Sequence, residues 1–305
     1  MTHRDVINTI TFHSCVDVAI QCVAAAGITD WQTAFDKQIT NAKKLGLMPA
    51  DFNVMRETLQ SFGFILQGTA IEGKYASEVL SCLCKLVTDA TVFLQVPDYM
   101  YVGGYLVAVQ IRDGQYYLIN LPSSKSFPDW SKVSHVWIHW SDGIDKSPYP
   151  RQAPRKTKKE KNRKPHLEAP YYKPFQPNPF CNNTGDCVVR AIAGVMDISW
   201  NEVVDMLAEE KNATVNLTTV YSAVLRKKGF VHHHPLVRNG RRLDGKAFCE
   251  EMNKLYHNGE RILAHVGRLH VAAIVPSTTD GKTSYTIMDS WNSSKRLIGE
   301  YWVWK

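Results

Sequence analysis

The sequence predicts an α+β fold in which a helical part is followed by an antiparallel β-sheet, and it predicts this arrangement twice along the chain. In each half, amphipathic helical patterns come first and short β-rich runs follow them. Between the halves, residues 147–179 are rich in proline and positive charge. The same features also recur in the same order in both halves.

The length and composition agree with two domains. A chain of 305 residues with 44% hydrophobic residues can bury two cores of ordinary size. We place a first domain at residues 1–146, a flexible linker at 147–179 and a second domain at 180–305. No apolar run reaches the roughly 18 residues of a membrane span, and the N-terminus lacks a secretory pattern. The odd number of cysteines, seven, argues against a disulfide framework, so we expect a cytoplasmic protein without membrane partners.

The positive charge of the chain belongs to the linker. The segment that begins at Arg151 and ends at Lys173 holds nine Lys or Arg and two Glu, which equals the net charge of +7 of the whole chain. With so few aliphatic residues it cannot offset its ordering entropy, so we expect an extended or disordered connector. A solvated spacer is the simpler interpretation. The alternative is a weak contact with nucleic acid or an acidic partner, with Tyr171, Tyr172 and Phe175 available for stacking.

The two halves match feature by feature. Each has a cysteine before a buried helical pattern, then a Gly-Phe, then a Gly-Lys before another helical pattern, and finally strand-like runs. The spacings differ by only a few residues, so we interpret the chain as a tandem duplication. The matching positions are Cys15 and Cys187, Gly63 and Gly229, Gly73 and Gly245, Tyr105 and His270, Asn120 and Asp289, and Trp140 and Trp304.

Helix starts and ends can be predicted from local signals. Ser199 with Glu202 three residues later has the pattern of a capping box, and Thr29 with Gln32 stands at the matching place in the first half. Gly63 and Gly229 are typical of glycines that end a helix. In the second half we expect strands near residues 261–266, 270–276, 284–289 and 300–304, with a turn at Asp280-Gly281.

Three residues of the second half form a candidate catalytic set. Cys187 follows a loop and begins a helix, where the helix dipole favours a thiolate. A thiolate needs an imidazole to carry the proton, and His270 begins an apolar strand. Asp289 ends the next strand, so antiparallel pairing would bring it beside His270 to orient the ring. We therefore predict Cys187 as nucleophile, His270 as base and Asp289 as the orienting group.

In this order, a cysteine opening a helix, His270-Val-Ala-Ala-Ile and Asp289-Ser-Trp-Asn resemble the papain-like cysteine peptidases. The segment from residue 183 to 193 is also similar to small papain-fold proteins of phages. The resemblance implies two tandem papain-like domains and cleavage of a peptide or isopeptide bond in a protein or peptide substrate, without metal or other cofactor. Many family members carry an oxyanion-binding glutamine where Cys181 stands here. Asn182 or Asn183, with the Cys187 backbone N–H, is expected to replace it.

The first half departs from this pattern. Tyr105 stands where His270 stands in the second half, and Asn120 stands where Asp289 does. A tyrosine has a pKa of about 10 and is a poor base at neutral pH. We interpret the first half as a pseudoenzyme domain that serves substrate binding, scaffolding or partner recognition.

Other classes of function stay open. A free cysteine is usually a small core residue, and only the register with His270 and Asp289 favours catalysis by Cys187. The chain could instead be a viral or phage binding protein that sequesters a factor in the cytoplasm of its host. It could also be another thiol acyltransferase or an amidase, since the same residue types serve those reactions. We expect Arg190 to pair with an acidic residue of the fold, and His232–His234 not to hold a metal.

Overall fold

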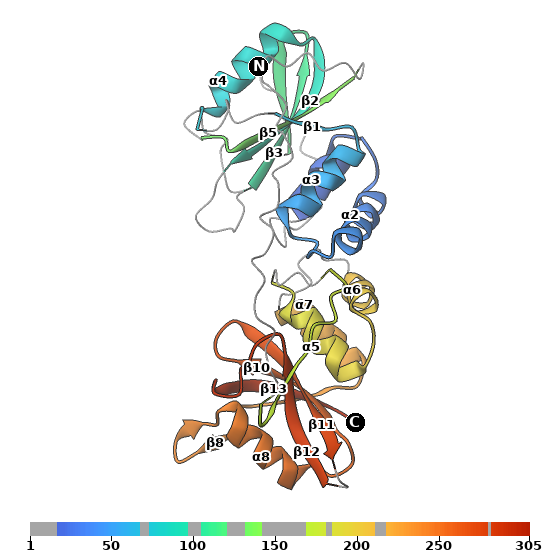
Figure 1. Ribbon diagram of the computed structural model, residues 1–305. Coiled ribbons are helices and arrows are strands. Elements are labelled where there is room, and N and C mark those ends of the chain that lie inside the picture. Colours follow the sequence, from blue (N-terminus) through green and yellow to red (C-terminus); the bar gives the residue numbers. More distant parts are fainter. Residues whose placement is uncertain are drawn as a thin grey trace. The chain divides into compact units, whose positions relative to one another are not determined.

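The computed structural model describes residues 17–67, 73–96, 105–120, 132–141, 169–180, 185–210, 218–279 and 282–305. Helices precede most of the strands in each half of the chain, so the α+β class is confirmed (Figure 1). The chain divides into two compact units, residues 1–42 with 49–158 and residues 43–48 with 159–305. No helix in the described ranges is both long enough and apolar enough to cross a membrane.

In the first half, the described residues form four helices and a five-stranded sheet. The helices are α1 (Asp17–Ala25), α2 (Trp31–Leu45), α3 (Phe52–Ser61) and α4 (Ala76–Leu86). The strands are β1 (Ile65–Leu66), β2 (Asp89–Val96), β3 (Tyr105–Arg112), β4 (Gln115–Asn120) and β5 (His135–Trp140). Their order in the sheet is β1-β5-β2-β3-β4, and neighbours pair antiparallel.

In the second half, the described residues form four helices, a six-stranded sheet and a small hairpin. The helices are α5 (Cys187–Met196), α6 (Trp200–Ala208), α7 (Thr218–Lys227) and α8 (Gly245–Leu255). The sheet has the order β6-β12-β11-β10-β13-β7. Its strands are β6 (Tyr172–Pro174), β7 (Val231–His233), β10 (Arg261–Val266), β11 (His270–Thr279), β12 (Lys282–Asp289) and β13 (Ile298–Trp304). The hairpin consists of β8 (Val237–Arg238) and β9 (Arg241–Arg242).

The two large sheets share one topology. Without β6, the second sheet reads β12-β11-β10-β13-β7, and the first sheet reads β4-β3-β2-β5-β1. The strands therefore correspond one to one in chain order, and in both halves three helices precede the first short strand of this set. The backbone of Tyr105 begins β3 as His270 begins β11, and Asn120 ends β4 as Asp289 ends β12. The sequence matches thus fall at equivalent places in the fold.

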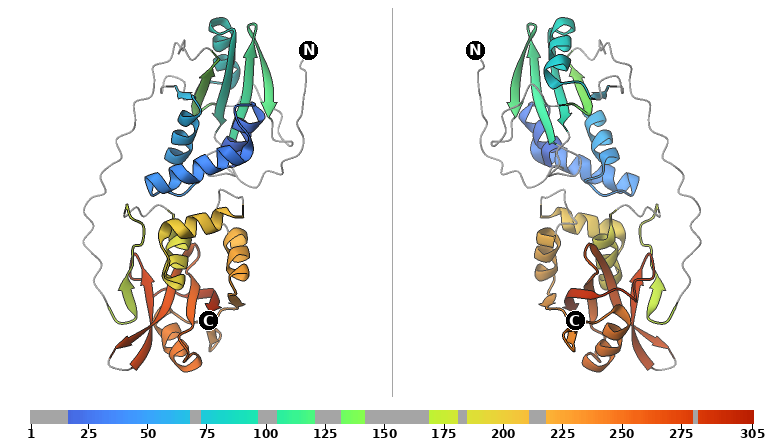
Figure 2. Two further views of the ribbon diagram at one scale, coloured as in Figure 1. Left: turned by 90° about the vertical axis from the view of Figure 1, so that its right-hand side faces the viewer. Right: turned by 90° about the vertical axis from the view of Figure 1, so that its left-hand side faces the viewer.

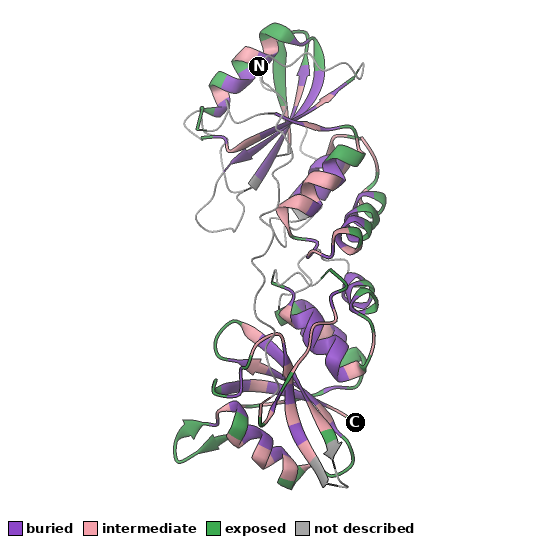
Figure 3. Cartoon of the chain, in the orientation of Figure 1, coloured by how far each residue is buried: buried purple, intermediate pink, exposed green. Residues whose placement is uncertain are grey.

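In the second half, α5 and α8 cover opposite faces of the sheet. Ala272 and Ile274 of β11 belong to one core cluster with residues of α8, whereas Ala273 between them faces Gly194 of α5. Because side chains alternate along a strand, these contacts lie on opposite faces. The strands separate α5 from α8 in the views of Figure 2. Helix α5 is buried from Val188 to Val195 (Figure 3), so it packs into the unit as a central helix.

Most of the helix signals are confirmed. The Ser199 hydroxyl accepts from the Glu202 N–H at 3.2 Å, and the Glu202 carboxylate accepts from the Ser199 N–H at 2.7 Å. Gly63 and Gly229 each follow a helix with φ of +84°, the left-handed conformation that glycine adopts freely. The capping prediction at Thr29 is wrong by one residue. Asp30 accepts the N–H of Thr33 at 2.9 Å, because its carboxylate is the acceptor that lies nearest the free N–H groups of α2.

The linker prediction needs correction at its C-terminal end. Residues 172–174 form β6, which runs parallel to β12 with Tyr172 beside Ile287. Tyr172 is only 1% exposed and is therefore not available for stacking on a partner. The side chain of Phe175 lies against Gly194, so it also belongs to the folded unit. The charged part of the predicted linker, residues 151–168, lies outside the described residues.

Candidate active site

The predicted nucleophile lies at the first residue of α5. Backbone N–H groups in this first turn have no partners within the helix and carry partial positive charge. Asp186 precedes Cys187, and its buried carboxylate pairs with Arg190 Nε at 2.9 Å. The same carboxylate accepts from Asn178 Nδ2 at 3.2 Å and from Trp200 Nε1 at 3.1 Å. This network fixes the start of α5, and it confirms the structural role predicted for Arg190.

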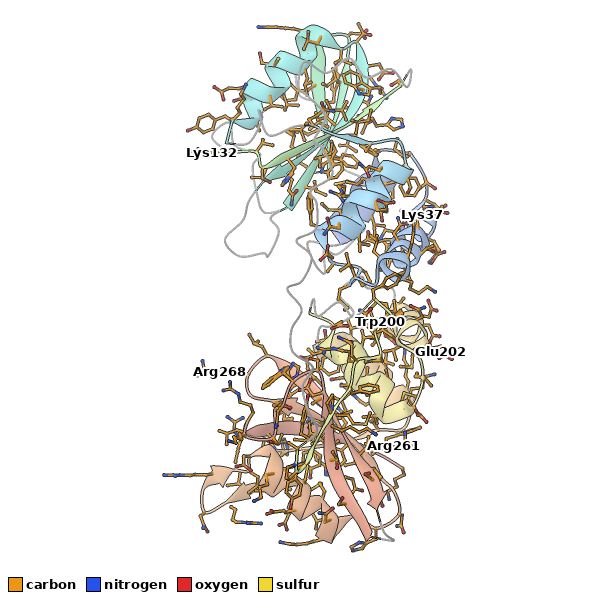
Figure 4. The ribbon with its side chains drawn as sticks, viewed as in Figure 1. Lys37, Lys132, Trp200, Glu202, Arg261 and Arg268 are labelled. Atoms are coloured by element: carbon orange, nitrogen blue, oxygen red, sulfur yellow. The ribbon has the colours of Figure 1, made fainter. Side chains whose placement is uncertain are left out.

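Contacts near the other end of α5 fix the helix on the sheet. Arg261 Nη1 donates to the Val195 carbonyl oxygen at 3.0 Å, which places a cation at the negative end of the helix dipole. Figure 4 labels Arg261, and also Trp200 at the start of α6. A Cβ at Gly194 would lie 3.0 Å from Cβ of Ala273 and 3.1 Å from Cε1 of Phe175. The glycine therefore allows a close approach of α5 to β11, the strand that carries His270.

Asp289 holds the His270 ring from the adjacent strand. His270 Nε2 lies 2.7 Å from Asp289 Oδ2, and Ser293 Oγ donates to the same oxygen at 2.8 Å. The Ser290 N–H donates to the other carboxylate oxygen at 2.7 Å. The Asp289 carboxylate is 3% exposed, so its charge is poorly screened by water. Because Nε2 is engaged, Nδ1 is the ring nitrogen left for another partner.

Cys187 interacts with the same imidazole. The pKa values of Cys187 and His270 each respond to a hydrogen bond between the two side chains, and the backbone of Val271 also interacts with the Cys187 sulfur. Burial by itself raises the pKa of the Cys187 thiol, but the hydrogen bond and charge of His270, with smaller effects of Val271 and Arg190, bring it below its ordinary value. Burial likewise opposes protonation of His270, yet Asp289 and Cys187 raise its pKa to about 9. The opposite shifts favour a thiolate–imidazolium pair at neutral pH.

Trp291 borders the histidine on one side. Its ring centroid lies 5.2 Å from that of His270, with the two ring planes tilted by 43°. Trp291 therefore packs against the imidazole that Asp289 holds. The predicted oxyanion donors, Asn182 and Asn183, lie outside the described residues.

Sequence reasoning missed several groups beside the triad. Ser293 is fully buried and donates to Asp289, but a serine in a loop gives no sequence signal for this contact. Tyr221 of α7 hydrogen-bonds through its hydroxyl to Nε2 of His265 on β10. Burial raises the pKa of Tyr221, and the charge of Cys187 contributes to the shift. Tyr221 has the spacing of an ordinary core residue in its helix.

In the described part of the first half, two histidines belong to the core packing rather than to a site like that of His270. His135 and His139 lie on β5 and pack against Phe52 and Phe64, with ring centroids 4.8 Å and 5.3 Å apart. Both are therefore part of the aromatic packing between the helices and the sheet. Cys15 lies outside the described residues.

Among the described residues, no three His, Cys, Asp or Glu side chains are grouped so that they could hold a metal ion. His232 and His233 lie on β7 and contact Trp302 and Tyr301, each with ring centroids 4.9 Å apart. Comparison of the chain with protein-family models, with curated proteins and with solved structures gave no match.

Proposed function

We propose that the second half of the chain is a papain-like cysteine peptidase domain that hydrolyses a peptide or isopeptide bond through Cys187. One observation carries the proposal. Cys187, His270 and Asp289 form a hydrogen-bonded series in which the pKa of the thiol is lowered and that of the imidazole is raised. Such coupled shifts are typical of functional sites, because a structural cysteine gains nothing from a stabilised thiolate.

The reaction that follows from this arrangement has two stages. The Cys187 thiolate attacks the carbonyl carbon of the amide and forms a C–S bond. The His270 imidazolium gives its proton to the amide nitrogen, the C–N bond breaks, and the amine leaves. His270 then takes a proton from water as the water attacks the thioester, and the acid is released with the thiolate restored. Asp289 keeps the ring oriented and stabilises its charge throughout.

The negative oxygen that develops on the substrate needs donors. The backbone N–H of Cys187 belongs to the free N–H groups at the start of α5, where the helix dipole favours negative charge. We propose Asn182 or Asn183 as the second donor, since both precede Cys187 by only a few residues.

For the first half, we infer a degenerate copy of the same domain. The shared sheet topology supports a tandem duplication, and Tyr105 and Asn120 occupy the backbone positions of His270 and Asp289. Tyrosine at the position of the base leaves this copy without a group that titrates near neutral pH there. Its proposed role is recognition of a substrate or partner.

The proposal can be tested with p-nitrophenyl acetate as an acyl donor. We expect a stoichiometric burst of p-nitrophenolate, an acetyl group on Cys187 by mass spectrometry, and slower turnover as water removes it. Cys187→Ala and His270→Ala should abolish both phases, whereas Cys84→Ala should not, because burial raises the pKa of that thiol. Acetylation spread over several cysteines would contradict the proposal. A stable acetyl-Cys187 would contradict hydrolysis and favour transfer to another acceptor.

A further inference from the structure

We infer that the substrate of the proposed peptidase carries acidic residues on the leaving-group side of the scissile bond, where a basic surface beside His270 binds them. The inference rests on the proposed function and names the substrate class of the same site. The basic surface is defined as six exposed residues on the loop after β12, the start of α8, the β8–β9 hairpin and the turn before β11. They are Arg241, Arg242, Lys246, Arg268, Lys295 and Arg296.

One aromatic ring connects this surface to the catalytic histidine. Trp291 lies against His270, and the guanidinium carbon of Arg296 lies 5.8 Å from the centroid of the Trp291 ring. On the other side of His270, the turn that carries Arg268 directly precedes the histidine and is exposed. The N–H of Gly267 in that turn donates to the Leu297 carbonyl oxygen at 2.8 Å. The turn and the loop after β12 are therefore held together next to the imidazole.

The same loop is held against α8 and the hairpin. The Gly245 N–H donates to the Arg296 carbonyl oxygen at 2.9 Å, and the Lys246 N–H donates to the Ser294 carbonyl oxygen at 2.9 Å. Strand β13 continues the contact, since the N–H of Ile298 donates to the Leu243 carbonyl oxygen at 2.8 Å. Leu243 directly follows the two hairpin arginines in sequence. These backbone contacts hold the segments that carry the six cations next to one another.

The hairpin presents its arginines to solvent. Its turn has Asn239 and Gly240 with φ of +51° and +73°, the left-handed pair that suits a tight two-residue hairpin. Arg241 and Arg242 follow at once and are exposed. They line a shallow hollow between the hairpin and the start of α8. In Figure 4, side chains ending in blue nitrogen atoms surround this hairpin, and Arg268 is labelled.

The positive charge of the surface is mostly unneutralised within the described part of the chain. Glu251 pairs with Arg238 and Lys254, and Glu250 lies 3.9 Å from Lys246. In that part the structure records no ion pair for the other five members of the basic surface, namely Arg241, Arg242, Arg268, Lys295 and Arg296. Asp244 also lines the hollow beside Arg241 and Arg242, but the cations outnumber the nearby carboxylates. Cations in such excess raise the local concentration of anionic ligands and their association rates.

The position of the basic surface determines which part of the substrate contacts it. His270 must give its proton to the leaving nitrogen, so the leaving portion of the substrate lies on the imidazole side of the thiolate. Trp291 and Arg296 border that side. Two apolar side chains, Leu269 at 96% exposure and Leu297 at 46%, stand among the cations. A surface that offers apolar contacts among its cations suits a polypeptide with acidic residues better than it suits the phosphate backbone of a nucleic acid.

The test uses epoxysuccinyl probes on the full chain. Each probe carries a Glu-Glu-Glu, Gln-Gln-Gln or Lys-Lys-Lys tail in the orientation that directs the tail beyond the imidazole, and a fourth probe has no tail. The measured quantity is the rate constant for alkylation of Cys187, read by mass spectrometry. We expect the Glu tail to react about tenfold faster than the Gln tail at low salt, the Lys tail to be slowest, and high salt to remove the difference.

Two charge-reversal variants locate the effect. Arg241→Glu/Arg242→Glu should lose most of the preference for the Glu tail. Arg226→Glu/Lys228→Glu is the matched control, because these exposed cations at the end of α7 lie outside the basic surface, and it should keep the preference. Equal rates for the Glu and Lys tails, or an unchanged preference in the hairpin variant, would overturn the inference.

The same experiment distinguishes an error in the inferred acidic substrate from an error in the proposed peptidase function. If the probe without a tail does not alkylate Cys187 selectively, the peptidase proposal fails. If it does, and the tails make no difference, only the acidic substrate is wrong. Oligothymidylate is added as a competitor in a final arm. If this oligonucleotide protects Cys187 better than a Glu-rich peptide of equal charge does, the basic surface binds nucleic acid rather than an acidic polypeptide.

Discussion

His270 Nε2 lies 2.7 Å from Asp289 Oδ2, and this contact determines which ring nitrogen faces the thiol. With Nε2 bound to the carboxylate, only Nδ1 can exchange a proton with Cys187 or with a substrate. The two strands that carry these residues are adjacent and antiparallel, and their paired residues run from Ala273–Met288 to Thr279–Lys282, so His270 and Asp289 lie directly beyond the last pair. The two side chains are therefore brought together by the neighbouring ends of two strands.

Asp289→Ala should slow alkylation of Cys187 by iodoacetamide at pH 6. The change removes the nearest negative charge, so the pKa of His270 falls and the thiolate loses its partner. A charge-assisted hydrogen bond is worth about 1.5–3 kcal/mol, which corresponds to roughly 10- to 150-fold in rate. Asp289→Asn keeps an oxygen acceptor, so its alkylation rate should lie between the rates of Asp289→Ala and the wild type. An Ala variant that reacts as fast as the wild type would show that Asp289 is only a structural residue.

Ser293→Ala should destabilise the fold through loss of the donor to Asp289. Ser293 is fully buried and its hydroxyl lies 2.8 Å from Oδ2 of the carboxylate. We expect a decrease of about 1 kcal/mol in the free energy of unfolding, measured by urea denaturation. Ser290→Ala is the matched control, because Ser290 contacts Asp289 through its backbone N–H and keeps that bond. Equal effects of the two variants would count against the assigned role of the hydroxyl.

Gly194→Ala should displace α5 from β11. The new Cβ would lie 3.0 Å from the Cβ of Ala273, which is tighter than most Cβ contacts, so helix or strand must give by a few tenths of an ångström. Overpacking of this kind costs about 1–3 kcal/mol. We also expect slower alkylation of Cys187, since the thiol moves with its helix. The double variant with Ala273→Gly should recover part of the loss, and no recovery would mean that the contact with Ala273 is not responsible.

Tyr221→Phe should act mainly on the stability of the fold and have little effect on the Cys187 thiolate. The tyrosine hydroxyl bonds to His265, and without it a half-buried imidazole nitrogen loses its partner. An unsatisfied buried group costs about 1–3 kcal/mol. Thr218→Ala, which removes a longer contact of 3.3 Å to the same hydroxyl, is the control and should cost less. Differential scanning calorimetry of both variants checks the order, and a larger loss in Thr218→Ala would contradict it.

Much of the second half could be predicted from the sequence, because its signals are local. The strand at 261–266 has the bounds of β10, and the capping box at Ser199 is formed as the pattern indicates. The placement of His270 and Asp289 follows from antiparallel pairing of two short strands. Their contact could be inferred because a β-strand register converts sequence order into proximity.

The features that sequence missed depend on contacts between distant residues. The sequence gives no strand signal for β6, because prolines and charged residues surround it. Its burial comes from pairing with β12, which lies more than a hundred residues later in the chain. The donor role of Ser293 and the Tyr221–His265 pair likewise depend on tertiary packing. The basic surface joins three stretches of sequence, residues 241–246, 268 and 295–296, and the charge count of the chain, dominated by the linker, conceals it.

The central claim is that Cys187 is a thiolate stabilised by protonated His270. The most direct test is the pH dependence of iodoacetamide alkylation of Cys187, followed by mass spectrometry in the wild type and in His270→Gln. The account predicts a first rise in rate at a pH below about 8.5, the ordinary thiol value, as the lowered pKa of Cys187 is passed. A second step should follow near pH 9, where His270 loses its proton. In His270→Gln the first step should move up to or above the ordinary thiol value. A single step at about 8.5 or higher in both proteins would contradict the account.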